Sequence, residues 1–132
     1  MRDFPGYLEI NLSFLELQKM VKDPNANSIW HKMLSLVGGV YLILDTKDGL
    51  QYVGSAAGKE GILGRWKEYA ENGHGGNKKL KGIIDSDPKR VQKFKFSILQ
   101  TLPRTLTKNE VLIEENKYKH KLGSRAYGLN LN

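Results

Sequence analysis

Apolar residues recur along this chain with two different periods, and the periods predict where helices and strands lie. Residues 13–21, 28–37 and 61–72 carry apolar side chains three or four positions apart, which is typical of helices. The first helix begins with the capping-box spacing Ser13-Phe14-Leu15-Glu16, and Asp23-Pro24 ends it. The pattern therefore predicts two N-terminal helices and a third helix near the middle of the chain.

Three other segments have the patterns of β-strands. Residues 39–45 and 50–55 are apolar runs joined by Thr46-Lys47-Asp48-Gly49, and an Asp-Gly pair in this position strongly indicates a hairpin. Phe94-Lys95-Phe96-Ser97-Ile98 alternates apolar and polar residues, as a third strand should. We therefore expect an α/β (α+β) fold with a small three-stranded antiparallel sheet flanked by helices and a helical N-terminal lead-in.

Two more helices are expected in the second half of the chain. The glycine-rich loop 73–77 leads into a short helix that ends before Asp87-Pro88. A second capping box, Thr107-Lys108-Asn109-Glu110, opens a helix that Gly123 closes. No linker between these elements divides the chain.

Each arm of the predicted hairpin carries a tyrosine beside a glycine, in Gly39-Val40-Tyr41 and in Tyr52-Val53-Gly54. Hairpin loops of two or four residues both place Tyr41 and Tyr52 on one face of the sheet, because side chains alternate along a strand. Such a pair usually serves packing. Glycine inside a strand, however, often marks the close approach of another backbone or of a ligand.

Composition narrows the classes of partner. The 132 residues carry a formal net charge of +7 and no cysteine. A basic balance favours a polyanion such as nucleic acid, although a lysine-rich solvated surface explains it equally well. The lack of cysteine excludes disulfides and thiolate metal sites and fits a cytoplasmic protein. No apolar run approaches the roughly 20 residues of a membrane span, so we expect no membrane association.

Polar residues at two helical positions are candidates for chemistry. Glu115 lies in the middle of an apolar stripe formed with Val111, Tyr118 and Leu122. An inward carboxylate requires a cation, a metal or several donors, and an ordinary pair with Lys119 would also satisfy it. Arg65 stands at the margin of the apolar face of helix 61–72, where it could bind a phosphate or simply extend into solvent.

The ordered set of these residues resembles the GIY-YIG nuclease superfamily, and within it a bacterial group. Residues 39–41 and 52–54 match the two name-giving motifs, and Arg65 matches the arginine of the following helix. Further positions match the family's Tyr or His after that arginine, its metal-binding glutamate and its terminal asparagine, namely Tyr69, Glu115 and Asn130. The resemblance covers about residues 38–132, and residues 1–37 are then a helical lead-in from a missing N-terminal region. The branch of this superfamily that incises DNA in bacterial excision repair has a lysine just after the second motif. Ser55 stands at that position here, which argues against that branch.

The resemblance implies a divalent-metal-dependent endonuclease that hydrolyses DNA phosphodiester bonds. Glu115 would hold Mg²⁺ or Mn²⁺ largely through water, and Arg65 would brace the scissile phosphate. Tyr41 is the first choice for the residue that activates water, with Tyr52 beside it. Tyr69 and His74 would complete the catalytic set, and DNA, most simply double-stranded, would contact Lys59, Lys67, Asn77, Lys78, Lys79, Lys81, Arg125 and Asn130.

Two other functions fit the same residues. The chain could be a catalytically inactive module that binds nucleic acid or protein within a larger protein, or a purely structural domain. No base-reading element is evident, so sequence specificity would come from a missing N-terminal domain or a specificity partner. The sequence does not fix the oligomeric state.

Overall fold

Four antiparallel strands form the centre of the computed structural model, which describes residues 1–131. They are β1 (Asn11–Ser13), β2 (Val37–Asp45), β3 (Gln51–Ala56) and β4 (Phe94–Pro103), in the spatial order β1-β4-β2-β3. The prediction of three strands was wrong, because β1 pairs with residues 95–97 of β4 and adds a fourth strand at that edge. A strand of only three residues is too short to show a period of two in the sequence.

The β2–β3 hairpin has the four-residue loop that the sequence allowed. Tyr41 pairs with Gly54, and Ile43 pairs with Tyr52. The Asp45 N–H donates to the Leu50 carbonyl at 2.9 Å and closes the loop. Tyr41 and Tyr52 therefore lie on one face of the sheet, as predicted.

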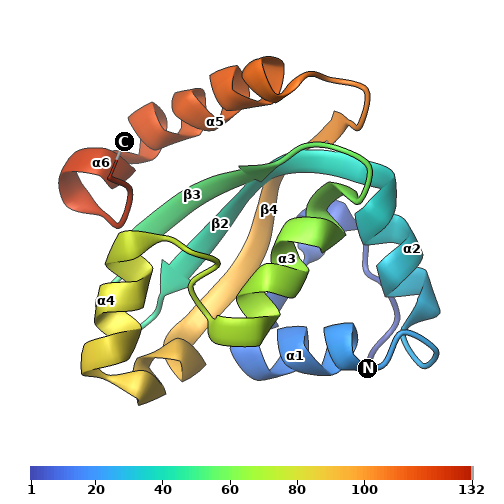
Figure 1. Ribbon diagram of the computed structural model, residues 1–132, viewed down its shortest axis with the longest axis horizontal. Helices are drawn as coiled ribbons and strands as arrows, with labels where there is room; N and C mark the ends of the chain where they lie inside the picture. The colour runs from blue at the N-terminus through green and yellow to red at the C-terminus, as the bar shows by residue number, and fades with distance from the viewer. Residues whose placement is uncertain (132) are drawn as a thin grey trace.

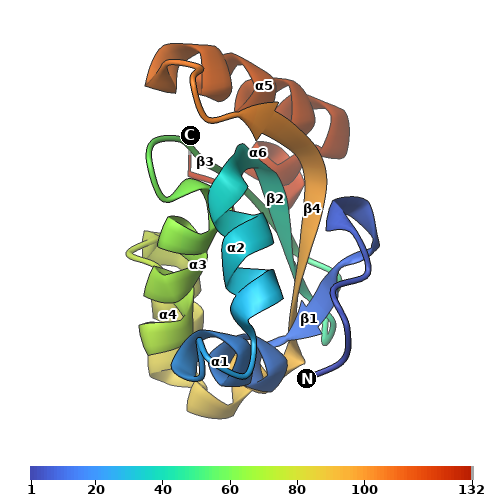
Figure 2. The same ribbon diagram turned by 90° about the vertical axis from the view of Figure 1, so that its right-hand side faces the viewer.

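Helices cover both faces of the sheet and make three layers (Figures 1 and 2). One face carries α1 (Phe14–Lys22), α2 (Ser28–Leu36) and α3 (Gly61–Asn72), with α4 (Lys78–Ser86) beside them. The other face carries α5 (Lys108–Leu122), which is followed by α6 (Ser124–Tyr127). Two short 3-10 helices, η1 (Tyr7–Glu9) and η2 (Pro88–Lys93), complete the connections. The five helices expected from periodicity are all present.

Each face of the sheet has its own hydrophobic core. The larger core, on the side of α1–α3, includes Tyr41, Trp66, Tyr69 and Phe96, all fully buried. The smaller core, under α5, includes Val40, Val53, Leu102 and Val111. Successive residues of β2 and β3 thus face different layers, and this alternation decides on which side each site residue lies.

Residues 1–36 complete the larger core. Leu12, Leu17 and Leu34 are fully buried in it. The Trp30 Nε1–H donates to the Arg2 carbonyl at 2.9 Å, which ties the first residues onto α2. This segment therefore adds strand β1 to the sheet and packs α1 and α2 against it, and its link to a further N-terminal region stays a prediction. Within residues 1–131, no helix is both long and apolar enough to cross a membrane.

Candidate active site

Two buried phenols from β2 and α3 form the inner part of the candidate site. The hydroxyl oxygens of Tyr41 and Tyr69 lie 2.9 Å apart, and both side chains are fully buried. Gly54 makes room for the Tyr41 ring, because a Cβ at Gly54 would lie 2.5 Å from the Tyr41 hydroxyl oxygen. Gly39 likewise lets β4 approach, with the Gln100 carbonyl oxygen 2.4 Å from where its Cβ would be. Both glycines thus serve contacts within the protein.

Tyr52 is the more accessible tyrosine of the hairpin. Its side chain is half-buried, whereas Tyr41 has no exposed surface. Burial raises the pKa of Tyr52, a hydrogen bond with Tyr69 lowers it, and the negative charge of Glu115 raises it again. These influences place Tyr52 within electrostatic reach of residues from both helical layers. Burial also raises the pKa of Tyr41 far above its ordinary value, so Tyr41 stays protonated at neutral pH.

Arg65 lies over the tyrosines from the first turns of α3. Its Nη2 donates to the Tyr69 hydroxyl at 3.3 Å, and its guanidinium carbon lies 5.1 Å from the centre of the Tyr69 ring. Further contacts run to the Gly75 carbonyl and to the Glu68 carboxylate. The side chain keeps 30% of its surface exposed. Contacts with Tyr69, Gly75 and Glu68 therefore hold Arg65 in place, and its solvent-exposed part remains accessible to an anion.

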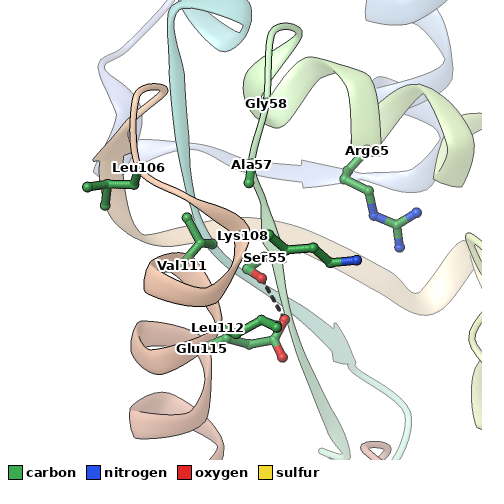
Figure 3. Close-up of a pocket in the computed structure, with 9 residues that line it drawn as sticks. All are labelled: Ser55, Ala57, Gly58, Arg65, Leu106, Lys108, Val111, Leu112 and Glu115. Carbon is green, nitrogen blue, oxygen red and sulfur yellow. Dashed lines mark hydrogen bonds between the residues drawn. The ribbon is translucent and has the colours of Figure 1, made fainter.

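Glu115 projects from α5 toward the other face of β3 (Figure 3). Its Oε1 accepts a hydrogen bond from the Ser55 hydroxyl at 2.7 Å, and its Oε2 lies 2.7 Å from the Lys119 ammonium. The carboxylate thus faces inward, as predicted, and it also makes the pair with Lys119 that was the simpler alternative. Lys119 is itself only 5% exposed.

Arg65 and Glu115 both line a cleft beyond the edge of β3, and none of Tyr41, Tyr52 and Tyr69 lines it. Ser55 pairs with Val40 and shares the face of α5, so the Glu115 carboxylate and the phenols lie on opposite faces of the sheet. The cleft has a volume of about 580 Å³. The remaining lining residues are Ser55, Ala57, Gly58, Leu106, Lys108, Val111 and Leu112.

The loop before α4 lies beside Tyr52. The Asn77 side chain caps α4 by accepting from the Leu80 N–H at 2.9 Å, and its hydrogen bond with Tyr52 lowers the pKa of that phenol. His74 Nδ1 accepts from the Gly76 N–H at 2.8 Å, which shapes the glycine-rich loop. Asn77 therefore lies near enough to Tyr52 to influence its pKa, whereas His74 organises the loop that carries Asn77.

The predicted DNA-contacting residues fall into two groups. Lys59 precedes α3, Lys67 lies in the middle of α3 and Lys78 begins α4, and all three are exposed. Lys81 is exposed but paired with Asp85. Lys79 is half-buried and donates to the Gly128 carbonyl at 3.4 Å. None of these lysines lines the cleft that Arg65 and Glu115 share.

Two predicted contacts have a different place in the structure. Asn130 is 2% exposed, and its amide accepts from the Val53 N–H and donates to the Val53 carbonyl, both at 2.8 Å. Arg125 donates to Asn116 on a hollow at the outer surface of α5, and no residue lining that hollow lines the cleft. Both side chains are thus bound to this chain, away from the cleft.

Sequence reasoning missed Lys108 as a site residue. It begins α5, and its side chain extends across the cleft toward the side where Arg65 lies (Figure 3). In the sequence it was noted only as part of a capping box, and only the packing of α5 across the edge of β3 brings it to the cleft.

Glu115 supplies the carboxylate that lines the cleft, and this limits which metal ions the cleft can bind. Among residues 1–131, no three His, Asp or Glu side chains come together as a metal-binding group. Mg²⁺ commonly keeps several waters and uses one or two carboxylates together with substrate phosphates. Glu115 lines an open cleft, and an ionised carboxylate oxygen can accept more than the one bond that Ser55 donates. The residues therefore fit a water-rich Mg²⁺ or Mn²⁺ site at Oε1.

The sequence was compared with models of known protein families. The model of the GIY-YIG catalytic domain matches residues 37–128, which is more than half of the chain. The chain belongs to the GIY-YIG family. A search of curated proteins gives no match.

Two solved structures of GIY-YIG proteins resemble this chain. A point mutant of the catalytic domain of the intron endonuclease I-TevI is 27% identical, with a TM-score of 0.57 over 73% of this chain and 94% of that one. The catalytic domain of the homing endonuclease I-TevI is 26% identical, with a TM-score of 0.54 over 72% and 98% of the two chains. The GIY-YIG assignment confirms the resemblance found from the motifs.

Proposed function

We propose that this GIY-YIG protein is an endonuclease that hydrolyses DNA phosphodiester bonds with a divalent metal ion, Mg²⁺ or Mn²⁺, at Glu115. The observation that carries the proposal is the cleft, which both the Arg65 guanidinium and the Glu115 carboxylate line, with Arg65 donating a hydrogen bond to Tyr69 of the tyrosine cluster. A cation and a carboxylate on either side of an open hollow suit a phosphodiester that also needs a metal. The similarity to I-TevI catalytic domains, described as intron and homing endonucleases, supports DNA as the substrate.

Arg65 binds the scissile phosphate through the part of its guanidinium that Tyr69 and Gly75 leave free. It then stabilises the charge that develops on the phosphate oxygens. A divalent ion at Glu115 supplies neutralisation of charge on the phosphate and on the leaving oxygen.

Tyr52 orients the attacking water, because its hydroxyl is the least buried of the three clustered phenols. Tyr41 was the first choice from the sequence, but its hydroxyl is fully buried against Tyr69. Its role is to hold Tyr69, which in turn holds Arg65. Protonated phenols at neutral pH suit orientation of water better than removal of its proton.

The DNA backbone crosses the cleft between Arg65 and Lys108 and continues over the exposed lysines near α3 and α4. Because each neutralised phosphate releases counterions, the affinity should fall steeply as salt concentration rises. Double-stranded DNA is the expected form, and sequence specificity comes from a further N-terminal region or a partner.

Nicking of supercoiled plasmid in Mg²⁺ or Mn²⁺ tests the proposal. The wild-type chain should nick, and Glu115→Gln should lose activity by at least about a hundredfold, the scale expected when a group that stabilises transition-state charge is removed. Glu114→Gln is the matched control, because Glu114 precedes Glu115 on α5 and pairs with Lys117 at the surface. Equal activity of Glu115→Gln and wild type would overturn the assignment.

A second candidate function is a DNA-binding module that does not cut. One observation favours it: Lys119 already neutralises the carboxylate that a metal would need. This candidate predicts salt-dependent DNA binding and no nicking by the wild-type chain in either metal.

A further inference from the structure

Lys119 is an unusual lysine because it points into the protein. Its side chain is 6% exposed, and its ammonium lies 2.7 Å from Glu115 Oε2, one helical turn earlier on α5. Lysine is almost never buried unless it is paired with an opposite charge. Lys117 shows the ordinary arrangement on the same helix, with 58% of its side chain exposed and a surface pair with Glu114.

The two oxygens of Glu115 therefore have different partners. Oε1 accepts from a neutral hydroxyl, and Oε2 is bound by a full positive charge. A metal ion can share Oε1 with Ser55, because a hydroxyl donates one hydrogen bond and leaves lone pairs free. A metal ion at Oε2 would lie next to the ammonium, and the positive charge of the ammonium would repel it. The pairing thus leaves one coordinating oxygen and holds the carboxylate in a fixed orientation.

We propose that Lys119 acts as a counter-charge: its positive charge, held beside the Glu115 carboxylate, keeps the affinity of Glu115 for a divalent metal ion low until DNA is bound. The inference rests on the proposed role of Glu115 in holding the metal. In a partly buried site a nearby ammonium repels a divalent cation more strongly than it would in water. Phosphate oxygens in the cleft add negative charge near Arg65 and Lys108 and offset that repulsion. Metal binding and DNA binding are therefore cooperative in this protein.

The test measures Mn²⁺ affinity without DNA, by the loss of the free-ion signal in electron paramagnetic resonance. Lys119→Met removes the charge and keeps an unbranched side chain, so it should bind Mn²⁺ at least tenfold more tightly than wild type. Lys117→Met is the matched control and should leave the affinity unchanged. Adding Glu115→Gln to Lys119→Met should abolish the gain, because the carboxylate is the proposed ligand.

A second variant guards against a loss of folding. Lys119→Gln removes the charge but keeps a polar head, and circular dichroism of both variants reports whether the fold is retained. A DNA oligonucleotide with non-cleavable linkages should tighten Mn²⁺ binding to wild type more than to the folded Lys119 variant. Equal Mn²⁺ affinity of wild type and the folded variant would overturn the counter-charge role of Lys119. The nuclease proposal is tested separately, by plasmid nicking. Absence of both Mn²⁺ binding and nicking in every variant would overturn both proposals.

Discussion

Replacing Asn130 with alanine should destabilise the protein strongly, although this residue touches no substrate in our proposal. The Asn130 amide makes two hydrogen bonds of 2.8 Å to the backbone of Val53, which is fully buried in edge strand β3. In Asn130→Ala the Val53 N–H and carbonyl lose their partners in a place that solvent does not reach. Leaving a buried polar group unpaired costs about 1–3 kcal/mol.

The two lost bonds together should lower the free energy of unfolding by about 3 kcal/mol. For a chain of this size that corresponds to a fall in Tm of roughly 10 °C. Asn130→Asp should be comparably unstable at pH 7, because a carboxylate oxygen then faces the Val53 carbonyl. It should recover part of its stability as the pH falls toward about 4, because the buried carboxyl then takes up a proton and can donate again.

Urea and thermal unfolding, followed by circular dichroism, measure both effects. Asn116→Ala is the control, because Asn116 is an exposed asparagine that only accepts from Arg125, and it should change stability by less than about 0.5 kcal/mol. An Asn130→Ala protein as stable as the control, with weakened DNA binding instead, would refute the structural role and restore Asn130 to the DNA interface.

Three further predictions concern stability. Gly54→Ala should cost about 3 kcal/mol or more in urea unfolding, because its Cβ would strike the Tyr41 ring, whereas Gly82→Ala, in open space on α4, should stabilise by up to about 1 kcal/mol. The free energy of unfolding should fall as pH rises above about 10, because phenols ionise there in the unfolded chain while burial keeps the pKa of Tyr41 higher in the folded protein. The Tyr41→Phe variant should lose less stability over this pH range. An unchanged dependence of stability on pH in that variant would contradict this explanation. Leu12→Ala should lower the free energy of unfolding by about 2–5 kcal/mol, because Leu12 is fully buried in the core. Leu15 is 59% exposed, so Leu15→Ala should lower it little, and equally small losses in both variants would contradict the packing of residues 1–36.

Local signals in the sequence were enough to place the helices and the hairpin. The two capping boxes are both formed, with Ser13 and Thr107 accepting from the third residue of each helix. Asp48-Gly49 predicted the hairpin, and side-chain alternation then fixed the shared face of Tyr41 and Tyr52. These features depend on neighbours in the chain, so the order of residues reveals them.

Features that depend on distant contacts were beyond the sequence. Strand β1 has three residues, and it exists because β4 offers it an edge to pair with. The depth of Tyr41 follows from packing against Tyr69, Trp66 and Gly54. The double pairing of Asn130 joins positions 77 residues apart. Glu115 is the instructive case, because helical periodicity showed its direction and offered the pair with Lys119, but could not show that Lys119 is itself buried.

The position of Asn130 on β3 has a consequence for the timing of protein synthesis. Strand β3, which carries Tyr52 and Ser55, is made before most of the chain, but its outer edge gains backbone partners from residues 129 and 130. A ribosome must therefore release nearly the whole domain before this edge can close. A growing chain that already contains Tyr41, Tyr52 and Arg65 therefore still lacks the residues that close the edge of β3.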